Sequence, residues 1–327
     1  MYIDLLIKNI IHIKIKTDIR SAYKDIVNYF PNVTKKIINN TKYDYFIYYR
    51  IKTFESDKYK YLAQKGKDII PFRNEKYKQI NYKDCVIAYC SGNNYNEITE
   101  NVVIKKNNQI SLFIYNSKNH KTIIRLIREL IMQKLIVKGF FPIHSASYID
   151  KRKAIVYFGE KGSGKSRELL KKIYEGKNVI ANDINFIGKI NNKIYVVGIP
   201  YDFTFFKPEW LKTKEQEKNK NKTIEFEKIR FSPKNIEKEF NVKVFFKAEL
   251  KEIVYLDIKN NDEEKSEISF IKMNYYLTKY SREKNFNFPA FLNFNKNKIK
   301  YNYKILKKGI KKKYIGEKDR GIIWIKC

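Results

Sequence analysis

The stretch Gly159-Glu160-Lys161-Gly162-Ser163-Gly164-Lys165-Ser166 fits the pattern G-x-x-x-x-G-K-[ST] of a phosphate-binding loop. Such a loop needs glycines, because its backbone N–H groups wrap the phosphates closely and some of its residues take a positive φ. The apolar residues 154–158 before it predict a strand, and residues 165–174 after it predict a helix that ends near Gly176. The sequence therefore predicts a strand–loop–helix element that binds the phosphates of a nucleotide.

The residues of this loop have different expected roles. A lysine at the place of Lys165 supplies a positive charge to the β- and γ-phosphates, and a hydroxyl at the place of Ser166 is a Mg²⁺ ligand. The N-terminus of the following helix adds its dipole. We therefore predict ATP and Mg²⁺ as the cofactors. The residues predicted to bind the nucleotide are Gly159, Glu160, Lys161, Gly162, Ser163, Gly164, Lys165, Ser166 and Arg167.

An acidic residue and a histidine flank the loop along the chain. Asp183 follows the short apolar stretch 178–181, and a carboxylate at a strand end can bind the metal or accept the proton of an attacking hydroxyl. His144 lies on the predicted strand 142–149 before the loop. The competing interpretations are an aspartate that caps a turn and a histidine that packs in a sheet. Candidates for a positive charge on the transferred phosphoryl group are Arg152, Arg167, Arg230 and Arg282, and the sequence selects none of them.

The chain of 327 residues is long enough for two domains. We predict an N-terminal α+β domain at residues 1–117, with substrate recognition as its candidate role. The second domain, at 118–327, holds the phosphate-binding loop and carries a charged insertion near 207–229. Besides the elements named above, we predict strands at 2–7, 44–49, 85–89, 110–115 and 253–257, helices at 22–29 and 120–138, and a hairpin turn at Asn191-Asn192.

The composition and the first residues of the chain indicate its cellular location. No stretch of about 18 uncharged apolar residues is present, which excludes a membrane-spanning helix. The first residues lack the pattern of a signal peptide, so we expect a cytoplasmic protein without a membrane partner. The three cysteines, Cys85, Cys90 and Cys327, have the spacing of neither a disulfide framework nor a zinc site.

The formal net charge of +33 would suit a nucleic-acid partner, but the kind of cation argues against one. The chain has 58 lysines and only 10 arginines, whereas specific readers of nucleic acid rely on the bidentate contacts of arginine. Lysine, asparagine, isoleucine and tyrosine are abundant together, as codon bias in an AT-rich genome produces. We therefore do not expect nucleic acid as the partner, although the charge will attract polyanions at low salt.

Three separated elements together resemble the HPr kinase family. They are the run 143–147 with His144, the phosphate-binding loop, and the run 179–183 that ends in Asp183. The resemblance covers roughly residues 120–205. It implies a P-loop core like that of phosphoenolpyruvate carboxykinase and HPr kinase, and ATP-dependent phosphorylation of a serine on a small protein. It also implies that Asp183 is the general base and that His144 lies near the reacting phosphate and the acid pair. We predict Ser166 and Asp183 as the metal ligands, with Asp202 as an alternative acid.

The chain departs from the family pattern at two acidic positions. The first acid of the family's strand-end pair is Asn182 here, and no acid precedes Gly198, where the chain has Tyr195-Val196-Val197. The C-terminal signature of the reverse, phosphorolytic reaction is also missing, so we expect kinase activity alone. The run Val197-Gly198-Ile199-Pro200 is more similar to divergent HPr-kinase-like proteins, which include lasso peptide kinases that phosphorylate a C-terminal serine of a precursor peptide. Those proteins also carry an N-terminal α+β domain before the kinase core.

Three functional hypotheses follow. The first is a kinase that transfers the γ-phosphoryl group of ATP to a serine or threonine hydroxyl of a small protein or ribosomally made precursor peptide. The second is an ATP-binding regulatory or interaction module without kinase activity, which the missing acids favour. The third is a polyanion-binding protein that also holds ATP. The sequence does not specify the substrate or the oligomeric state.

Overall fold

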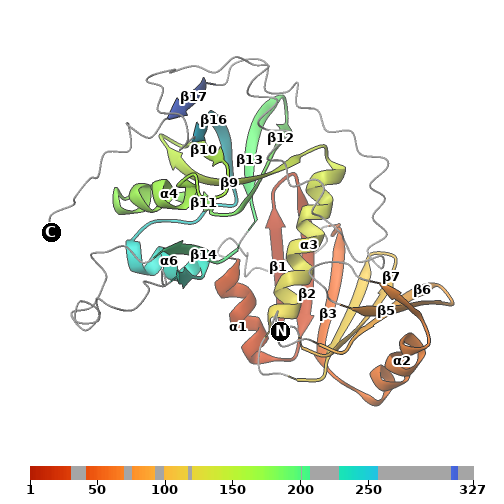
Figure 1. The fold of residues 1–327 in the computed structure, drawn as a ribbon. Coiled ribbons are helices and arrows are strands. Elements are labelled where there is room, and N and C mark those ends of the chain that lie inside the picture. The colour runs from red at the N-terminus through yellow and green to blue at the C-terminus, as the bar shows by residue number, and fades with distance from the viewer. Residues whose placement is uncertain are drawn as a thin grey trace, which may run out of the picture. The chain divides into compact units, whose positions relative to one another are not determined.

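The computed structural model describes residues 1–30, 42–69, 76–92, 99–116, 120–199, 201–206, 228–256 and 311–315. These residues form the mixed α/β fold that the sequence predicts (Figure 1). They divide into two compact units, one within Met1–Phe141 and one within Pro142–Ser281 together with the strand Lys311–Ile315. Within the described ranges, no helix is long and apolar enough to cross a lipid bilayer.

The first unit is built on one eight-stranded sheet with the order β1-β2-β3-β8-β7-β6-β5-β4. Strand β3 pairs in parallel with both of its neighbours, and the other pairs are antiparallel. The strands are β1 (Tyr2–Ile7), β2 (Ile11–Thr17), β3 (Tyr45–Ile51), β4 (Lys67–Ile69), β5 (Tyr77–Tyr82), β6 (Cys85–Cys90), β7 (Asn101–Lys106) and β8 (Gln109–Ile114).

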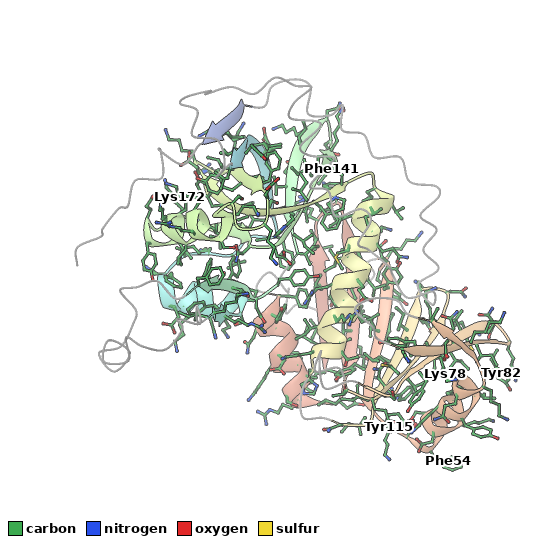
Figure 2. All side chains as sticks on the ribbon, in the orientation of Figure 1. Phe54, Lys78, Tyr82, Tyr115, Phe141 and Lys172 are labelled. Carbon is green, nitrogen blue, oxygen red and sulfur yellow. The ribbon has the colours of Figure 1, made fainter. Side chains whose placement is uncertain are left out.

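Three helices belong to the first unit: α1 (Arg20–Tyr29), α2 (Phe54–Gln64) and α3 (Lys121–Val137). The apolar spacing that predicted a helix over 120–138 is confirmed by α3, which lies in this unit and buries most of its apolar side chains. Helix α2 begins at a capping box made by Thr53. Tyr82 and Tyr115, near α2 in Figure 2, pack with the small apolar cluster around Ala63.

Two histidines of the first unit take part in buried polar contacts. His12 Nε2 lies 2.9 Å from Asp4 Oδ1, and both residues are buried. The ring of His120 joins Ser21 Oγ at 2.8 Å on one side and Tyr49 Oη at 2.9 Å on the other. Tyr49 is fully buried, so its hydroxyl is best satisfied by donating to Nδ1, which leaves the Nε2–H to donate to Ser21. Both histidines therefore serve the structure of this unit.

The second unit is built on a seven-stranded sheet with the path β10-β16-β13-β12-β9-β11, and β17 pairs with β16. Because β9 also pairs with β10, the path returns to its first strand. The strands of this sheet are β9 (Phe141–Asp150), β10 (Lys153–Gly159), β11 (Val179–Ala181), β12 (Ile184–Ile190), β13 (Lys193–Gly198), β16 (Lys247–Leu256) and β17 (Lys311–Ile315). The predicted turn at Asn191-Asn192 is confirmed, with φ of 47° and 63°.

Two helices and a hairpin pack on this sheet. They are α4 (Lys165–Tyr174), α6 (Pro233–Phe240), and the pair β14 (Phe203–Phe206) and β15 (Lys228–Phe231). Leu169 and Ile173 of α4 are buried in a core with Phe203, Phe205 and Ile236 of the other elements. This core fixes α4, and with it the loop that precedes the helix, against the sheet.

Candidate functional site

The predicted phosphate-binding loop lies between a buried strand and a helix. Strand β10 ends at Gly159 and α4 begins at Lys165, as the sequence predicts. The amide of Ser163 donates to Glu160 O at 3.1 Å, and the amide of Glu168 donates to Gly164 O at 2.9 Å. The first backbone N–H groups of α4 lack partners within the helix, and such groups at a helix N-terminus bind anions.

Two glycines of the loop occupy positions that other residues would not accept. Gly159 has φ of 153°, and a Cβ built on it would lie 2.3 Å from Leu256 O of the neighbouring strand. Gly164 is the N-cap of α4 and has φ of 83°. The glycines of the motif thus serve a close approach of two strands and a left-handed residue at the helix start.

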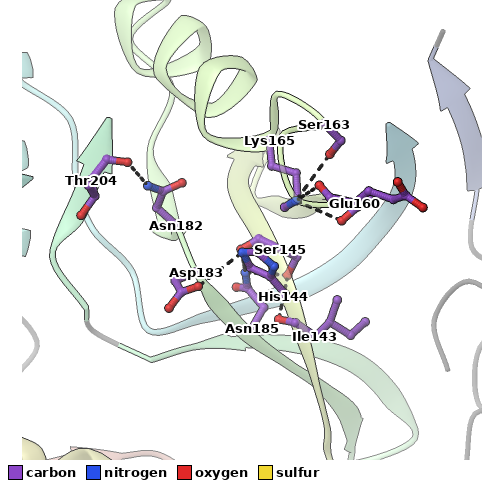
Figure 3. A network of polar contacts seen from close by, with 11 residues as sticks. Ile143, His144, Ser145, Glu160, Ser163, Lys165, Asn182, Asp183, Asn185 and Thr204 are labelled. Atoms are coloured by element: carbon purple, nitrogen blue, oxygen red, sulfur yellow. Dashed lines mark hydrogen bonds and ion pairs between the residues drawn. The ribbon is translucent and has the colours of Figure 1, made fainter. Parts of the chain in front are cut away.

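Lys165 directs its side chain back into the loop. Its ammonium donates to Gly159 O at 3.0 Å, to Glu160 O at 2.7 Å and to Ser163 Oγ at 3.4 Å (Figure 3). The residue is buried, although lysine is among the side chains least often buried. A positive charge is therefore held inside the turn, beside the N-terminal end of α4.

His144 and Asp183 come together although 39 positions separate them along the chain. His144 Nε2 lies 3.5 Å from Asp183 Oδ1, and about a third of each side chain is exposed. The backbones are joined as well, because the Ser145 amide donates to Asp183 O at 3.0 Å. The pair is thus open enough to meet a ligand and fixed enough to keep its geometry.

The register of two strands places this pair beside the loop. In the antiparallel pair β9–β10, Ser145 lies opposite Phe158. The residue before Ser145 is His144 and the residue after Phe158 is Gly159, so the histidine stands next to the first residue of the loop. Figure 3 shows His144 and Asp183 below the loop that carries Lys165. The structure therefore brings together three residues that the sequence singled out separately.

Asn182, the residue before Asp183, turns toward β14. Its Nδ2 donates to Thr204 O at 3.0 Å. Within the described residues its buried Oδ1 has no hydrogen-bond partner. An aspartate could not donate to the Thr204 carbonyl, so the amide has a structural use that a carboxylate would not fulfil.

A buried polar cluster, which residue patterns did not predict, is formed by Ser145, Ser147 and Asn185 directly behind the pair. All three residues are at most 1% exposed. Ser147 Oγ donates to Asn185 Oδ1 at 2.6 Å, and Asn185 Nδ2 donates to Ser145 O and Oγ at 3.1 and 3.0 Å. The available signal was the polar side chains at alternate positions of otherwise apolar strands.

Two tyrosines lie on the face of β9 and β10 that packs against Leu169 and Ile173 of α4. Tyr148 and Tyr157 are both buried there. Burial raises the pKa of Tyr148 and, more strongly, that of Tyr157. Both phenols therefore stay neutral near pH 7, and they act as packing groups rather than as bases.

The remaining candidates are dispersed. Arg152 is exposed in the turn between β9 and β10, Arg230 is exposed on β15, and Arg167 is exposed in the first turn of α4. Arg282 and residues 207–227 of the charged insertion lie outside the described residues. In the described part of the chain, no three His, Cys, Asp or Glu side chains are grouped as a metal site.

Comparisons with known proteins add little to this geometry. No protein-family model matches the chain, and no curated protein matches it. Among solved structures, the chain is similar to the HPr(Ser) kinase/phosphatase from Coxiella burnetii, with 14% sequence identity and a TM-score of 0.27. The alignment covers 38% of this chain and 65% of that chain, slightly less than two thirds of its length. Similarity of this degree carries no functional inference, which therefore rests on the chain's own residues.

Proposed function

We propose that the protein is an ATP-dependent kinase that phosphorylates a serine or threonine hydroxyl of a small protein or a precursor peptide. The observation that carries the proposal is the placement of the His144–Asp183 pair beside a glycine-rich turn that encloses the ammonium of Lys165. The turn can bind the phosphates of a nucleotide, and the carboxylate can accept the proton of a hydroxyl. Phosphoryl transfer needs these two sites side by side and little other chemistry.

Each residue has a distinct role in the proposed reaction. The ammonium of Lys165 leaves the loop carbonyls and donates to the β- and γ-phosphates of ATP. The substrate hydroxyl oxygen forms a bond to the γ-phosphorus while the bond from that phosphorus to the bridging oxygen of ADP breaks. Asp183 accepts the hydroxyl proton, and His144, in contact with Asp183, orients the carboxylate.

The residues present fit a magnesium ion that arrives with ATP. Mg²⁺ in such sites usually binds through one or two carboxylates, substrate phosphates and water, so a cluster of three acids is not required. The Ser166 hydroxyl and the Asp183 carboxylate are the groups that would hold it. When bound, the ion neutralises negative charge on the phosphates.

A regulatory ATP-binding module without transfer is the alternative, and Asn182 is the observation that favours it. A carboxylate is missing where the family has one, which weakens the attraction for a metal. The two proposals differ in a single measurable property, which is whether phosphate leaves ATP for a second molecule.

The test is incubation of the purified protein with γ-labelled ATP, Mg²⁺ and a peptide-enriched extract of the organism that makes it. Lys165→Ala and Asp183→Asn should abolish labelling, and Asp183→Asn should largely keep affinity for ATP. Lys172→Ala is the matched control, because this lysine lies on the same helix and its ammonium pairs with Glu175, away from the loop. Tight ATP binding without label on any protein or peptide would overturn the kinase and leave the regulatory module.

A further inference from the structure

We infer that Asn185 is a positioning residue that holds His144 and Asp183 in register for the reaction. The expected effect on the reaction rests on the proposed function. The structural role rests on the contacts alone, because Asn185 bonds to strand β9, which carries His144, from strand β12, which begins directly after Asp183.

The cluster around Asn185 is closed to ligands. Ser145 is 1% exposed, and Ser147 and Asn185 are 0% exposed. Side chains alternate along a strand, so Ser145 and Ser147 point to the opposite face from His144. None of the three can therefore touch a substrate at the His144–Asp183 pair, and any influence must pass through the backbone.

The hydrogen bonds of the cluster are directional and complete. Both functions of the Asn185 amide are used, since Oδ1 accepts from Ser147 while Nδ2 donates to the carbonyl and hydroxyl of Ser145. The Ser145 hydroxyl in turn donates to Ile143 O at 3.3 Å. The carbonyls of Ile143 and Ser145 flank His144 on either side. A fully satisfied buried network of this kind permits one arrangement of its strands and disfavours others.

The same network reaches Asp183 through one further bond. The amide of Ser145 donates to Asp183 O. Ser145 therefore links Asn185, which donates to it, to the backbone of the aspartate. Without Asn185, the backbone pairing of β9 with β12 and the Ser145 amide bond would remain, but the side-chain bonds that fix Ser145 against β12 would be lost. The 3.5 Å separation of His144 and Asp183 should then widen.

The test compares Asn185→Ala with Ile187→Val, a conservative truncation at a fully buried position on the same face of β12. The rate of phosphoryl transfer to the substrate found in the labelling experiment is measured at varied concentrations of ATP and of that substrate. Asn185→Ala should lower kcat about 10- to 100-fold, the range seen for outer-shell groups that orient metal ligands, and leave KM for ATP unchanged. Ile187→Val should leave both constants unchanged. Ser147→Ala, which removes one of the three contacts, should lower kcat less and serves if Asn185→Ala does not fold.

A second readout needs no catalysis. The nuclear Overhauser effect between the His144 ring protons and the Asp183 Hβ protons should weaken in Asn185→Ala and persist in Ile187→Val. An unchanged effect in Asn185→Ala overturns the inference whether or not the protein transfers phosphate. An absence of transfer in the unmodified protein instead overturns the proposed kinase, and the proton measurement still decides what Asn185 does.

Discussion

Replacement of Gly159 by alanine tests whether the end of β10 depends on the absence of a side chain. The new Cβ would lie 2.3 Å from Leu256 O and 2.8 Å from Ser163 Oγ. The hydroxyl can rotate away, but the carbonyl belongs to the paired strand β16, so the two backbones must separate by more than half an ångström. Crowding of this kind costs about 1–3 kcal/mol, and the positive φ costs a further ~1–2 kcal/mol.

Gly176→Ala is the matched control, because Gly176 has φ of 73° and nothing within 4 Å of a built Cβ. It should lose only the conformational part, about 1–2 kcal/mol. The two variants should therefore differ by about 1–3 kcal/mol, which corresponds to roughly a 5- to 150-fold difference in an opening equilibrium. Hydrogen exchange of the β10 amides measures that equilibrium within the second unit. Equal acceleration in both variants would refute the claim that the Leu256 carbonyl requires glycine at this position.

Three more predictions concern single residues elsewhere in the two units. Asn182→Asp should destabilise the second unit by about 1–3 kcal/mol in urea unfolding and more than Asn182→Ala does, because a carboxylate would face the Thr204 carbonyl; equal losses would contradict this. Burial lowers the pKa of His120, so the folded chain binds fewer protons than the unfolded chain between that lowered pKa and about 6.5. Stability of the first unit, followed by hydrogen exchange of α3, should consequently rise with pH through this window and level off above it, and His120→Gln should remove the slope. Leu169→Ala should cost about 2–5 kcal/mol because the side chain is fully buried beneath α4, and a loss under 1 kcal/mol would show that this core tolerates the cavity.

Elements with a strong local pattern were predictable from the sequence. Helix α3 was predictable because apolar residues recur at helical spacing and form one wide apolar face. The loop was predictable because glycine, lysine and serine stand at fixed places between a strand and a helix. Helix α2 was not, because its only buried residues, Ser56 and Ala63, leave no apolar stripe to detect.

Contacts between distant segments were beyond reach of the sequence. Strand β16 lies about 90 residues after β10 and still pairs with it in parallel, which creates the clash that makes Gly159 necessary. The Asp4–His12 contact was not predicted because a buried polar pair has no periodic signature. The proximity of His144 and Asp183 depends on how β9 pairs with β11 and with the chain at Asp183, which residue patterns alone do not give.

The two residues that follow β11, Asn182 and Asp183, have different functions. Asn182 turns to β14 and donates a hydrogen bond that a carboxylate cannot make, while Asp183 turns to His144. The two neighbouring side chains therefore cannot be exchanged, even though amide and carboxylate have nearly the same shape. It follows that the proposed reaction depends on one carboxylate, and that the contacts fixing this carboxylate matter more here than in a site with two. Ser145 belongs both to the buried cluster with Asn185 and Ser147 and to the backbone bond with Asp183, so the cluster meets the aspartate backbone at this residue.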